Sequence, residues 1–380
     1  MFGKYLNQYP QGAGADHVPP GWDEWYAGAT ETAYTNYGYR LNENGRTVGY
    51  GAAPEDYLTD VLAGHADAFL RRGTADRRPF FMYIAPYVPH APATPAPRHT
   101  DAFPGVQAPR PPSFNEADVS DKPSWVRDLP PLGPAQVRAL DATYRRRLQS
   151  LLAVEDMLER LDAALAETGA LDNTYVFFTS DHGYHIGQHR MPAGKLTPYD
   201  EDVRVRLIVR GPGVPAGHTA NSLVANLDLA PTFAALAGAA APEWVDGRSF
   251  ASQLGAEPAP ATWRSAVLLE QGADTADSGE PDDADEPGGG RPAAGRTRPQ
   301  PPAFRGLRTA GYKYVEYATG ERELYDLAAD PYELVNRAAS ADPALVAALS
   351  ARLDALRGCA GPDCRRLEDE PLPPAPVAVR

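Results

Sequence analysis

The sequence predicts an α/β fold: a mostly parallel sheet sandwiched by helices, followed by a small C-terminal antiparallel sheet with one helix. Two observations lead to this expectation. Before residue 271, short β-branched and aromatic runs alternate with helical stretches, which is typical of a parallel sheet covered by helices. After residue 303, strand-like runs follow one another closely, which indicates an antiparallel ribbon.

Four elements carry the parallel part of this prediction. Residues 79–85 (PFFMYIA) read as a central strand. A long helix is expected from about Pro134, because leucines recur from 140 to 165 at spacings near three and four. The uncharged run 174–179 (TYVFFT) is typical of a strand buried on both faces. Residues 203–209 (VRVRLIV) predict another strand, which Gly211-Pro-Gly213 ends.

The rest of the chain predicts a short helix, an insertion and a small subdomain. A short helix opens at Pro231, and 265–270 reads as a strand. Acids, prolines and glycines between 271 and 303 cannot form a core, and disorder is expected over 274–300. The expected divisions are a catalytic domain over 1–270, a linker or insertion over 271–303 and a subdomain over 304–380. The subdomain would contain strands at 307–317 and 323–327 and a helix from Asp342-Pro343 with leucines on one face.

Composition excludes several functions. The chain has 380 residues, of which 43% are hydrophobic, so it can bury a sizeable core. Its formal charge of −14 argues against nucleic acid or an anionic membrane surface as a partner. No apolar run is long enough to span a membrane, and the N-terminus lacks the basic and apolar regions of a signal peptide.

The stretch 179–204 (TSDHGYHIGQHRMPAGKLTPYDEDVR) concentrates acids, imidazoles and a lysine just after a predicted strand. In open α/β sheets, ligands bind beyond the carboxyl ends of the strands, so Asp181 and His182 lie where chemistry is expected. An isolated Asp-His-Gly is usually a surface turn, and an isolated lysine such as Lys195 is usually a solvated charge. The surrounding pattern is what favours function here.

That pattern resembles the second metal and sulfate motif of the sulfatases, most closely those similar to N-acetylglucosamine-6-sulfatase. The resemblance begins at 2–7 (FGKYLN), which is similar to the family's G-K motif, and continues to the end of the chain. It implies an alkaline-phosphatase-like fold and a sulfuric ester hydrolase that uses calcium. It also implies a sulfated carbohydrate, such as a glycosaminoglycan, or an aryl sulfate ester as substrate, and a secreted or periplasmic location.

The same resemblance assigns roles to six residues. Asp181 and His182 match metal ligands, although a hard ion such as calcium prefers the carboxylate oxygen. Lys195 matches the lysine that reaches the sulfate and the leaving-group oxygen. His90, in Pro89-His-Ala-Pro92, matches a histidine that binds sulfate and can protonate the leaving oxygen. The remaining two are Lys4, which in the family contacts nucleophile and sulfate, and Asn7, expected to contact substrate.

One family feature is absent from the sequence. Sulfatases attack with a formylglycine made in a C/S-x-P-S-R motif, which this chain does not contain. The expectation is therefore a sulfatase that lacks its first part and is inactive as given. Two alternatives stay open: a non-catalytic remnant that at most binds metal and anions, or a phosphoryl-transfer relative of the alkaline phosphatase superfamily.

Four further residues have simpler interpretations. His185 and His189 share the loop after Asp181, where hydrogen bonding to neighbouring groups or exposure explains them without a catalytic role. Cys359 and Cys364 flank a Gly-Pro turn; spacing and resemblance favour a disulfide over two free thiols. A disulfide would fit an oxidising, extracytoplasmic compartment.

Overall fold

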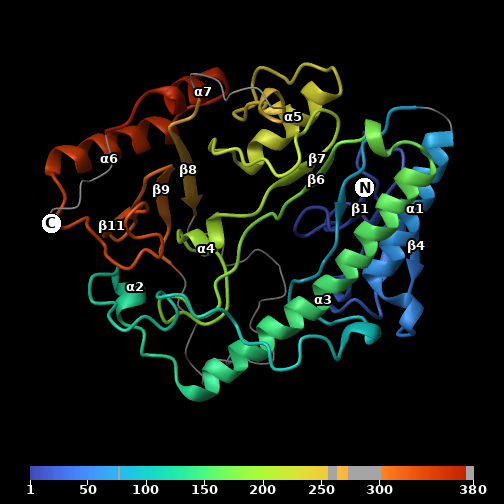
Figure 1. Cartoon of the computed structure of the whole chain (residues 1–380), viewed down its shortest axis with the longest axis horizontal. Helices are drawn as coiled ribbons and strands as arrows, with labels where there is room; N and C mark the ends of the chain where they lie inside the picture. Colours follow the sequence, from blue (N-terminus) through green and yellow to red (C-terminus); the bar gives the residue numbers. More distant parts are fainter. Residues whose placement is uncertain (76–77, 256–262, 273–300, 374–380) are drawn as a thin grey trace. The chain divides into compact units, whose positions relative to one another are not determined.

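The computed structural model describes residues 1–75, 78–255, 263–272 and 301–373, and these form two compact units (Figure 1). Within the described ranges, the first unit comprises 1–75, 78–109 and 132–174. The second comprises 110–131, 175–255, 263–272 and 301–373. No helix in these ranges is both long and apolar enough to cross a membrane.

The first unit contains a mixed five-stranded sheet with the order β4-β3-β2-β1-β5. β1 runs parallel to both β2 and β5, whereas the pairs β2–β3 and β3–β4 are antiparallel. The parallel part that the sequence predicts is therefore confined to β2, β1 and β5. The strands are β1 (Phe2–Gly3), β2 (Tyr26–Gly28), β3 (Arg40–Glu43), β4 (Arg46–Gly49) and β5 (Ile84–Ala85).

Two helices, α1 (Leu58–Ala75) and α3 (Pro134–Glu167), lie side by side in this unit (Figure 1). α3 begins where the sequence predicts, because Pro134 suits the first helical position and Gln136 accepts a hydrogen bond from the Gly133 amide at 2.9 Å. Its buried leucines contribute about 1.5–3 kcal/mol each by leaving water. Short 3-10 turns complete the unit at Glu31–Thr35, Pro54–Asp56, Pro97–His99 and Leu171–Asn173.

The strand expected at 79–85 is shorter than predicted and is not central. Only Ile84–Ala85 forms a strand, β5, at the end of the sheet as far as the described residues extend. Phe81 is 56% exposed and Tyr83 46% exposed. An apolar run indicates burial, but it does not specify how many neighbouring strands a segment has.

The second unit begins with an antiparallel pair, β6 (Val176–Phe178) and β7 (Ile208–Arg210). The expected burial of β6 on both faces is wrong, because Phe178 is 40% exposed and its partner Ile208 is 61% exposed. The strand expected over 203–209 begins only at Ile208. Val203 instead ends the helical turn α4 (Asp200–Val203), in which the Arg204 amide donates to the Asp200 carbonyl at 3.0 Å, and residues 204–207 have no regular secondary structure.

The C-terminal sheet is antiparallel throughout, with the order β11-β10-β9-β8. α6 packs on this sheet through Leu349, Leu353 and Leu356, which the sequence places on one helix face (Figure 1). Asp342 caps α6 by accepting a hydrogen bond from the Ala344 amide at 2.9 Å. The elements are β8 (Ala266–Gln271), β9 (Phe304–Thr309), β10 (Tyr312–Tyr317), β11 (Arg322–Asp326), α6 (Pro343–Arg357) and α7 (Pro362–Asp369).

Other expectations have mixed outcomes. The short helix is found as α5 (Leu229–Leu236), and the Cys359–Cys364 disulfide is present. β8 pairs with β9, so residues on both sides of the expected linker belong to one sheet. Residues 274–300 lie outside the described ranges, and the division at 270 and 304 stays a prediction. The remaining short helices are α2 (Ser124–Arg127), Asn226–Asp228 and Ala251–Gln253.

Candidate active site

Lys4 and His90 lie just beyond the carboxyl ends of β1 and β5, which are parallel neighbours. The two strands approach so closely that a Cβ on Gly3 would lie 2.0 Å from the Ala85 carbonyl oxygen, and Gly3 has a φ of +104°. Only glycine fits this position. The Lys4 amide then donates to the Ala85 carbonyl at 2.7 Å, which fixes where the lysine side chain begins.

Both side chains meet the ring of Tyr34. The Lys4 ammonium nitrogen is 5.6 Å from the centre of that ring, and the His90 imidazole centre is 4.6 Å from it. A cation near an aromatic face is attracted by the ring quadrupole. The first unit therefore brings together two of the predicted catalytic residues, 86 positions apart in the sequence, with a tyrosine that no sequence motif marks.

The His90 loop is fixed by its own backbone and by α3. The His90 amide donates to the Tyr87 carbonyl at 2.9 Å, and the Ala93 amide donates to the His90 carbonyl at 2.8 Å. Arg147 of α3 donates from Nη1 to the Pro89 carbonyl at 2.8 Å. These contacts restrict the positions that the imidazole can take, as a proton donor to a leaving group requires.

Asp181 and His182 follow β6 in a tight turn. The Asp181 carboxylate accepts a hydrogen bond from the His182 amide at 3.0 Å, and Asn226 donates to the Asp181 carbonyl at 2.9 Å. The Asp181 side chain is 71% exposed and that of His182 is 39% exposed. Gly183 is required for the turn, because a Cβ there would lie 2.0 Å from the Glu201 carbonyl oxygen.

The loop that carries Lys195 is closed on itself. His185 and Gly194 exchange backbone hydrogen bonds of 2.9 and 3.0 Å, one residue before Lys195. The His185 Nδ1 lies 2.9 Å from an Asp202 carboxylate oxygen, and Thr197 donates its hydroxyl hydrogen to that oxygen at 2.6 Å. These side chains are buried. The hydrogen-bonding interpretation of His185 is confirmed, and Asp202 is its partner.

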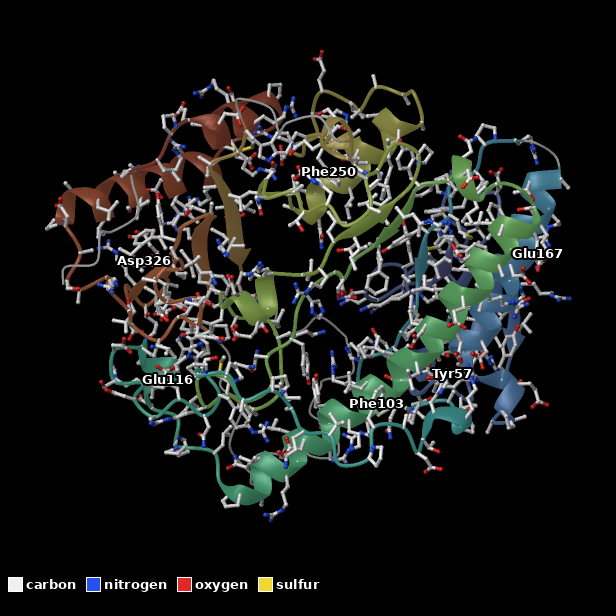
Figure 2. The ribbon with its side chains drawn as sticks, in the orientation of Figure 1. Tyr57, Phe103, Glu116, Glu167, Phe250 and Asp326 are labelled. Atoms are coloured by element: carbon white, nitrogen blue, oxygen red, sulfur yellow. A yellow bond between two sulfur atoms is a disulfide. The ribbon has the colours of Figure 1, made fainter. Side chains whose placement is uncertain are left out.

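His189 is held in the same way. It is fully buried, its Nδ1 lies 2.6 Å from a Glu116 carboxylate oxygen, and its ring stacks on Tyr199 with centres 4.2 Å apart. Figure 2 labels Glu116, which lies on the 110–131 segment of the second unit. Lys122 is also buried and lies 3.2 Å from Glu116, so this carboxylate bridges a cation and an imidazole. The hydrogen-bonding interpretation of His189 is confirmed as well.

An ionic cluster of buried Lys313 and Glu333 with half-buried Asp200 and Arg308 connects the end of this loop to β9 and β10. The Lys313 ammonium is fully buried, 2.8 Å from Asp200 and 2.7 Å from Glu333. Arg308 lies 2.8 Å from the other Asp200 oxygen. The Glu333 carboxylate accepts a hydrogen bond from the Asp200 amide at 2.7 Å. No motif in the sequence marks these four residues as a cluster.

The cluster shifts two carboxyl groups in opposite directions. Burial alone would raise the pKa of Asp200, but Lys313 and Arg308 outweigh it and hold that pKa well below its usual range. Burial raises the pKa of Glu333 to about 7, because the opposing effect of Lys313 is smaller and Asp200 adds repulsion. Asp200 is therefore the charge that ties the loop to the sheet at neutral pH.

The predicted site residues thus fall into two groups. Lys4 and His90 meet in the first unit, while Asp181, His182 and Lys195 share one closed loop in the second. The meeting of both groups in one cavity stays a prediction. Asn7 is exposed and lies three residues beyond Lys4.

Asp181 and His182 do not make a complete calcium site. Calcium takes six to eight oxygen ligands, and Asp181 supplies one carboxylate with an imidazole beside it. Among the described residues, no group of three His, Cys, Asp or Glu side chains is placed to hold a metal ion. The donors present therefore fit only part of such a site.

Comparison with known proteins identifies the family. Residues 2–239 match the profile of the Sulfatase family. N-acetylglucosamine-6-sulfatase from Bos taurus is 38% identical over 383 residues, which cover 96% of this chain and 66% of the relative. The extracellular sulfatase SULF-1 homolog from Drosophila melanogaster is 39% identical over 251 residues, which cover 65% of this chain and 22% of the relative.

A solved structure is similar in fold. It is of a protein in complex with its substrate D-glucosamine-2-N,6-O-disulfate, and it matches with a TM-score of 0.73 at 24% identity. The match covers 93% of this chain and 78% of that one. The likeness confirms the predicted α/β, alkaline-phosphatase-like fold. The profile of the Sulfatase family matches more than half of this chain, so the chain belongs to the sulfatase family.

Proposed function

We propose that this chain contributes to a sulfuric ester hydrolase that removes sulfate from a sulfated sugar, with aryl sulfates as a second substrate class. The observation that carries the proposal is the meeting of Lys4 and His90 at Tyr34. A sulfate ester needs cations for its delocalised charge and an acid for its leaving oxygen. Similar proteins support a sulfated sugar as the substrate. One is named N-acetylglucosamine-6-sulfatase, and the structure of another was solved with a sulfated glucosamine.

In this proposal each residue has a separate task. Lys195 and Lys4 bind the sulfate oxygens. Their positive charges stabilise the negative charge that develops as the S–O bond to the sugar breaks. His90 donates a proton to the departing sugar oxygen, which then leaves as an alcohol. Asn7 contacts the substrate beside Lys4. The protein has a net charge of −14, so these cations must be gathered locally to attract an anion.

Asp181 and His182 are proposed as two ligands of a divalent ion such as calcium, which sulfatases generally use. When bound, such an ion polarises the sulfate. The described residues supply too few oxygen donors to hold it alone. We expect weak calcium binding by this chain without further ligands.

The nucleophile is not among residues 1–380, because the sequence has no C/S-x-P-S-R motif from which sulfatases make formylglycine. Attack on sulfur therefore requires a segment that carries this motif. The chain as given is expected not to turn over sulfate esters at an appreciable rate.

A secreted or periplasmic location is also proposed. The chain has a Cys359–Cys364 disulfide. Disulfides persist in oxidising compartments and are rare in the cytosol. The Drosophila relative is named as extracellular.

The test restores the nucleophile. A segment with the C-x-P-S-R motif from a related sulfatase is fused before residue 1 and co-expressed with the formylglycine-generating enzyme. Release of sulfate from N-acetylglucosamine 6-sulfate and from an aryl sulfate is then measured. Lys195→Ala and His90→Ala should each lower kcat/KM at least about a hundredfold, which corresponds to roughly 3 kcal/mol of transition-state stabilisation.

The matched control is Arg366→Ala, which removes an exposed cation from α7 and should leave the rate unchanged. If the Lys195→Ala variant hydrolyses the esters at the full rate, Lys195 does not belong to the active site. Robust hydrolysis by residues 1–380 alone would show that the chain uses a nucleophile other than formylglycine. Faster hydrolysis of a phosphonate or phosphate monoester than of either sulfate would favour the phosphoryl-transfer alternative.

A further inference from the structure

A second feature of the first unit is an open pocket of about 570 Å³, formed by residues between 5 and 19 directly after Lys4. Pockets of this size accommodate small organic ligands. We call it the Tyr5–Pro19 pocket. Its polar and aromatic lining comes from Tyr5, Asn7, Gln8, Tyr9, Gln11 and His17.

The aromatic part of this pocket is rigid. The Tyr9 hydroxyl accepts hydrogen bonds from Trp25 Nε1 at 2.9 Å and from Asn42 Nδ2 at 3.0 Å. It donates to the His17 carbonyl at 2.5 Å. The Tyr5 ring packs edge-on against the fully buried Trp25, with centres 4.9 Å apart. A ligand therefore meets a wall whose rings are already fixed, which lowers the entropy cost of binding.

The rim of the pocket offers amide groups. Asn7, Gln8 and Gln11 are exposed, and their side chains make no hydrogen bond with any residue in the described ranges. Each amide has both donors and an acceptor, which matches hydroxyl groups that also donate and accept. Gln8 has a φ of +65°, and the Gln11 amide donates to its carbonyl at 2.5 Å, so the rim follows a tight turn.

The charge of the pocket decides the class of ligand. No carboxylate, ammonium or guanidinium group is among its described lining residues. The open pocket lined by Asp101, Arg145 and Arg146, also in the first unit, is of the opposite kind. A sulfate or phosphate group requires charged donors for tight binding, so it suits the arginine-lined pocket better. Fixed aromatic rings with neutral amides suit a neutral ligand that has both C–H faces and hydroxyl groups.

We propose that the Tyr5–Pro19 pocket binds a neutral sugar residue next to the sulfated one. This proposal rests on the proposed function, since it treats Lys4 as the point where sulfate is held. Tyr5 follows Lys4 directly, and the Lys4 ammonium lies over Tyr34 beside His90. On this proposal, a glycan whose sulfate is held at Lys4 contacts Tyr5 and the amide rim with its neighbouring ring, because the pocket lining begins at the residue after Lys4. The pocket selects oligosaccharides over a sulfated monosaccharide.

The test measures binding without catalysis. The full chain is titrated with the neutral N-acetylglucosamine tetrasaccharide, and tryptophan fluorescence and calorimetry report binding, since Trp25 lies beneath the pocket. We expect saturable binding in the millimolar range that inorganic sulfate does not displace. The double variant Gln8→Ala/Gln11→Ala should weaken it at least about fivefold.

Tyr5→Ala should weaken binding as well, and its circular dichroism shows whether the fold persists. The glutamine variant changes only exposed side chains, so it decides the question even where Tyr5→Ala does not fold. Tyr332→Ala, which removes a 42% exposed tyrosine from the second unit, is the matched control and should bind as the unsubstituted chain does.

Absence of saturable binding, displacement by sulfate, or equal affinity in the glutamine variant would each overturn the proposal. These outcomes are separable from those of the proposed function. If the fused enzyme hydrolyses sulfate esters but this chain does not bind the tetrasaccharide, only the proposal for the pocket is contradicted. Binding of the tetrasaccharide without any hydrolysis in the fused enzyme would contradict only the sulfatase activity.

Discussion

Glu333→Gln should change how the stability of the second unit depends on pH. Glu333 is 1% exposed and lies 2.7 Å from the equally buried Lys313. Its pKa is raised by burial from the ordinary 4.5 to about 7. Glutamine keeps the size of the side chain and a carbonyl oxygen for the Asp200 amide, but it cannot ionise.

The sign and size of the effect follow from linkage. Because the folded state binds the Glu333 proton more tightly than the unfolded state, the stability that this carboxyl contributes is complete below pH 4.5. It is lost as the pH rises toward 7. At about 1.36 kcal/mol per pH unit, the loss is roughly 3 kcal/mol. Asp200 does not interfere, because its lowered pKa moves its own contribution to more acidic pH.

The assay is urea unfolding of both proteins at pH 4.5, 6.0 and 7.5, followed by tryptophan fluorescence. The stability of the unsubstituted chain relative to Glu333→Gln should fall by roughly 3 kcal/mol across this range. Glu321→Gln is the matched control. Burial of Glu321 is outweighed by hydrogen bonds from Ser124, which lower its pKa, so its contribution changes below pH 4.5. A stability difference for Glu333→Gln that stays constant or grows with pH would refute the reasoning.

Three other substitutions test the framework. Gly183→Ala should lower the free energy of unfolding by at least about 1–3 kcal/mol, because its Cβ would lie 2.0 Å from a backbone carbonyl oxygen; a variant as stable as the parent in urea would contradict this turn. Replacing both Cys359 and Cys364 with serine should cost about 2 kcal/mol, given the short loop that the disulfide closes, and adding reductant to the parent should have the same effect. Leu353→Ala should cost about 2–5 kcal/mol in thermal or urea unfolding, whereas Val335→Ala, at a 50% exposed position, should stay within about 0.5 kcal/mol.

The sequence predicts what depends on local patterns. The start of α3 at Pro134 is predictable because both of its signals are local in the sequence: a proline at the first helical position and leucines at helical spacing. The face of α6 with Leu349 and Leu353, and the disulfide across a Gly-Pro turn, are local in the same sense. Lys4 and His90 are marked as candidates by motifs that resemble those of the family, and the structure places both side chains at Tyr34.

What the sequence did not predict depends on pairing between distant segments. The runs 79–85 and 174–179 read as interior strands from their apolar composition, yet Tyr83 and Phe178 within them are 46% and 40% exposed. Apolar composition does not determine how many strands pair with a segment. Lys313 lies 113 residues from Asp200, and nothing near either residue marks a buried ion pair. A lysine in a strand is usually exposed, so only the packing of β10 against the loop reveals its role.

The loop with Lys195 shows why buried charges suit this part of the molecule. The loop presents an exposed carboxylate at Asp181 and a lysine fourteen residues later. Part of it is held by hydrophobic packing, since Met191 and Tyr199 belong to a buried cluster. Its other fixed points are polar pairs: His185 hydrogen-bonded to Asp202, and the ion pair of Asp200 with Lys313. Breaking one buried pair leaves an uncompensated charge, which costs far more than a lost surface contact. Directional pairs of this kind restrict the backbone at both ends of the loop, and the C-terminal sheet thereby acts as part of the framework that positions Lys195.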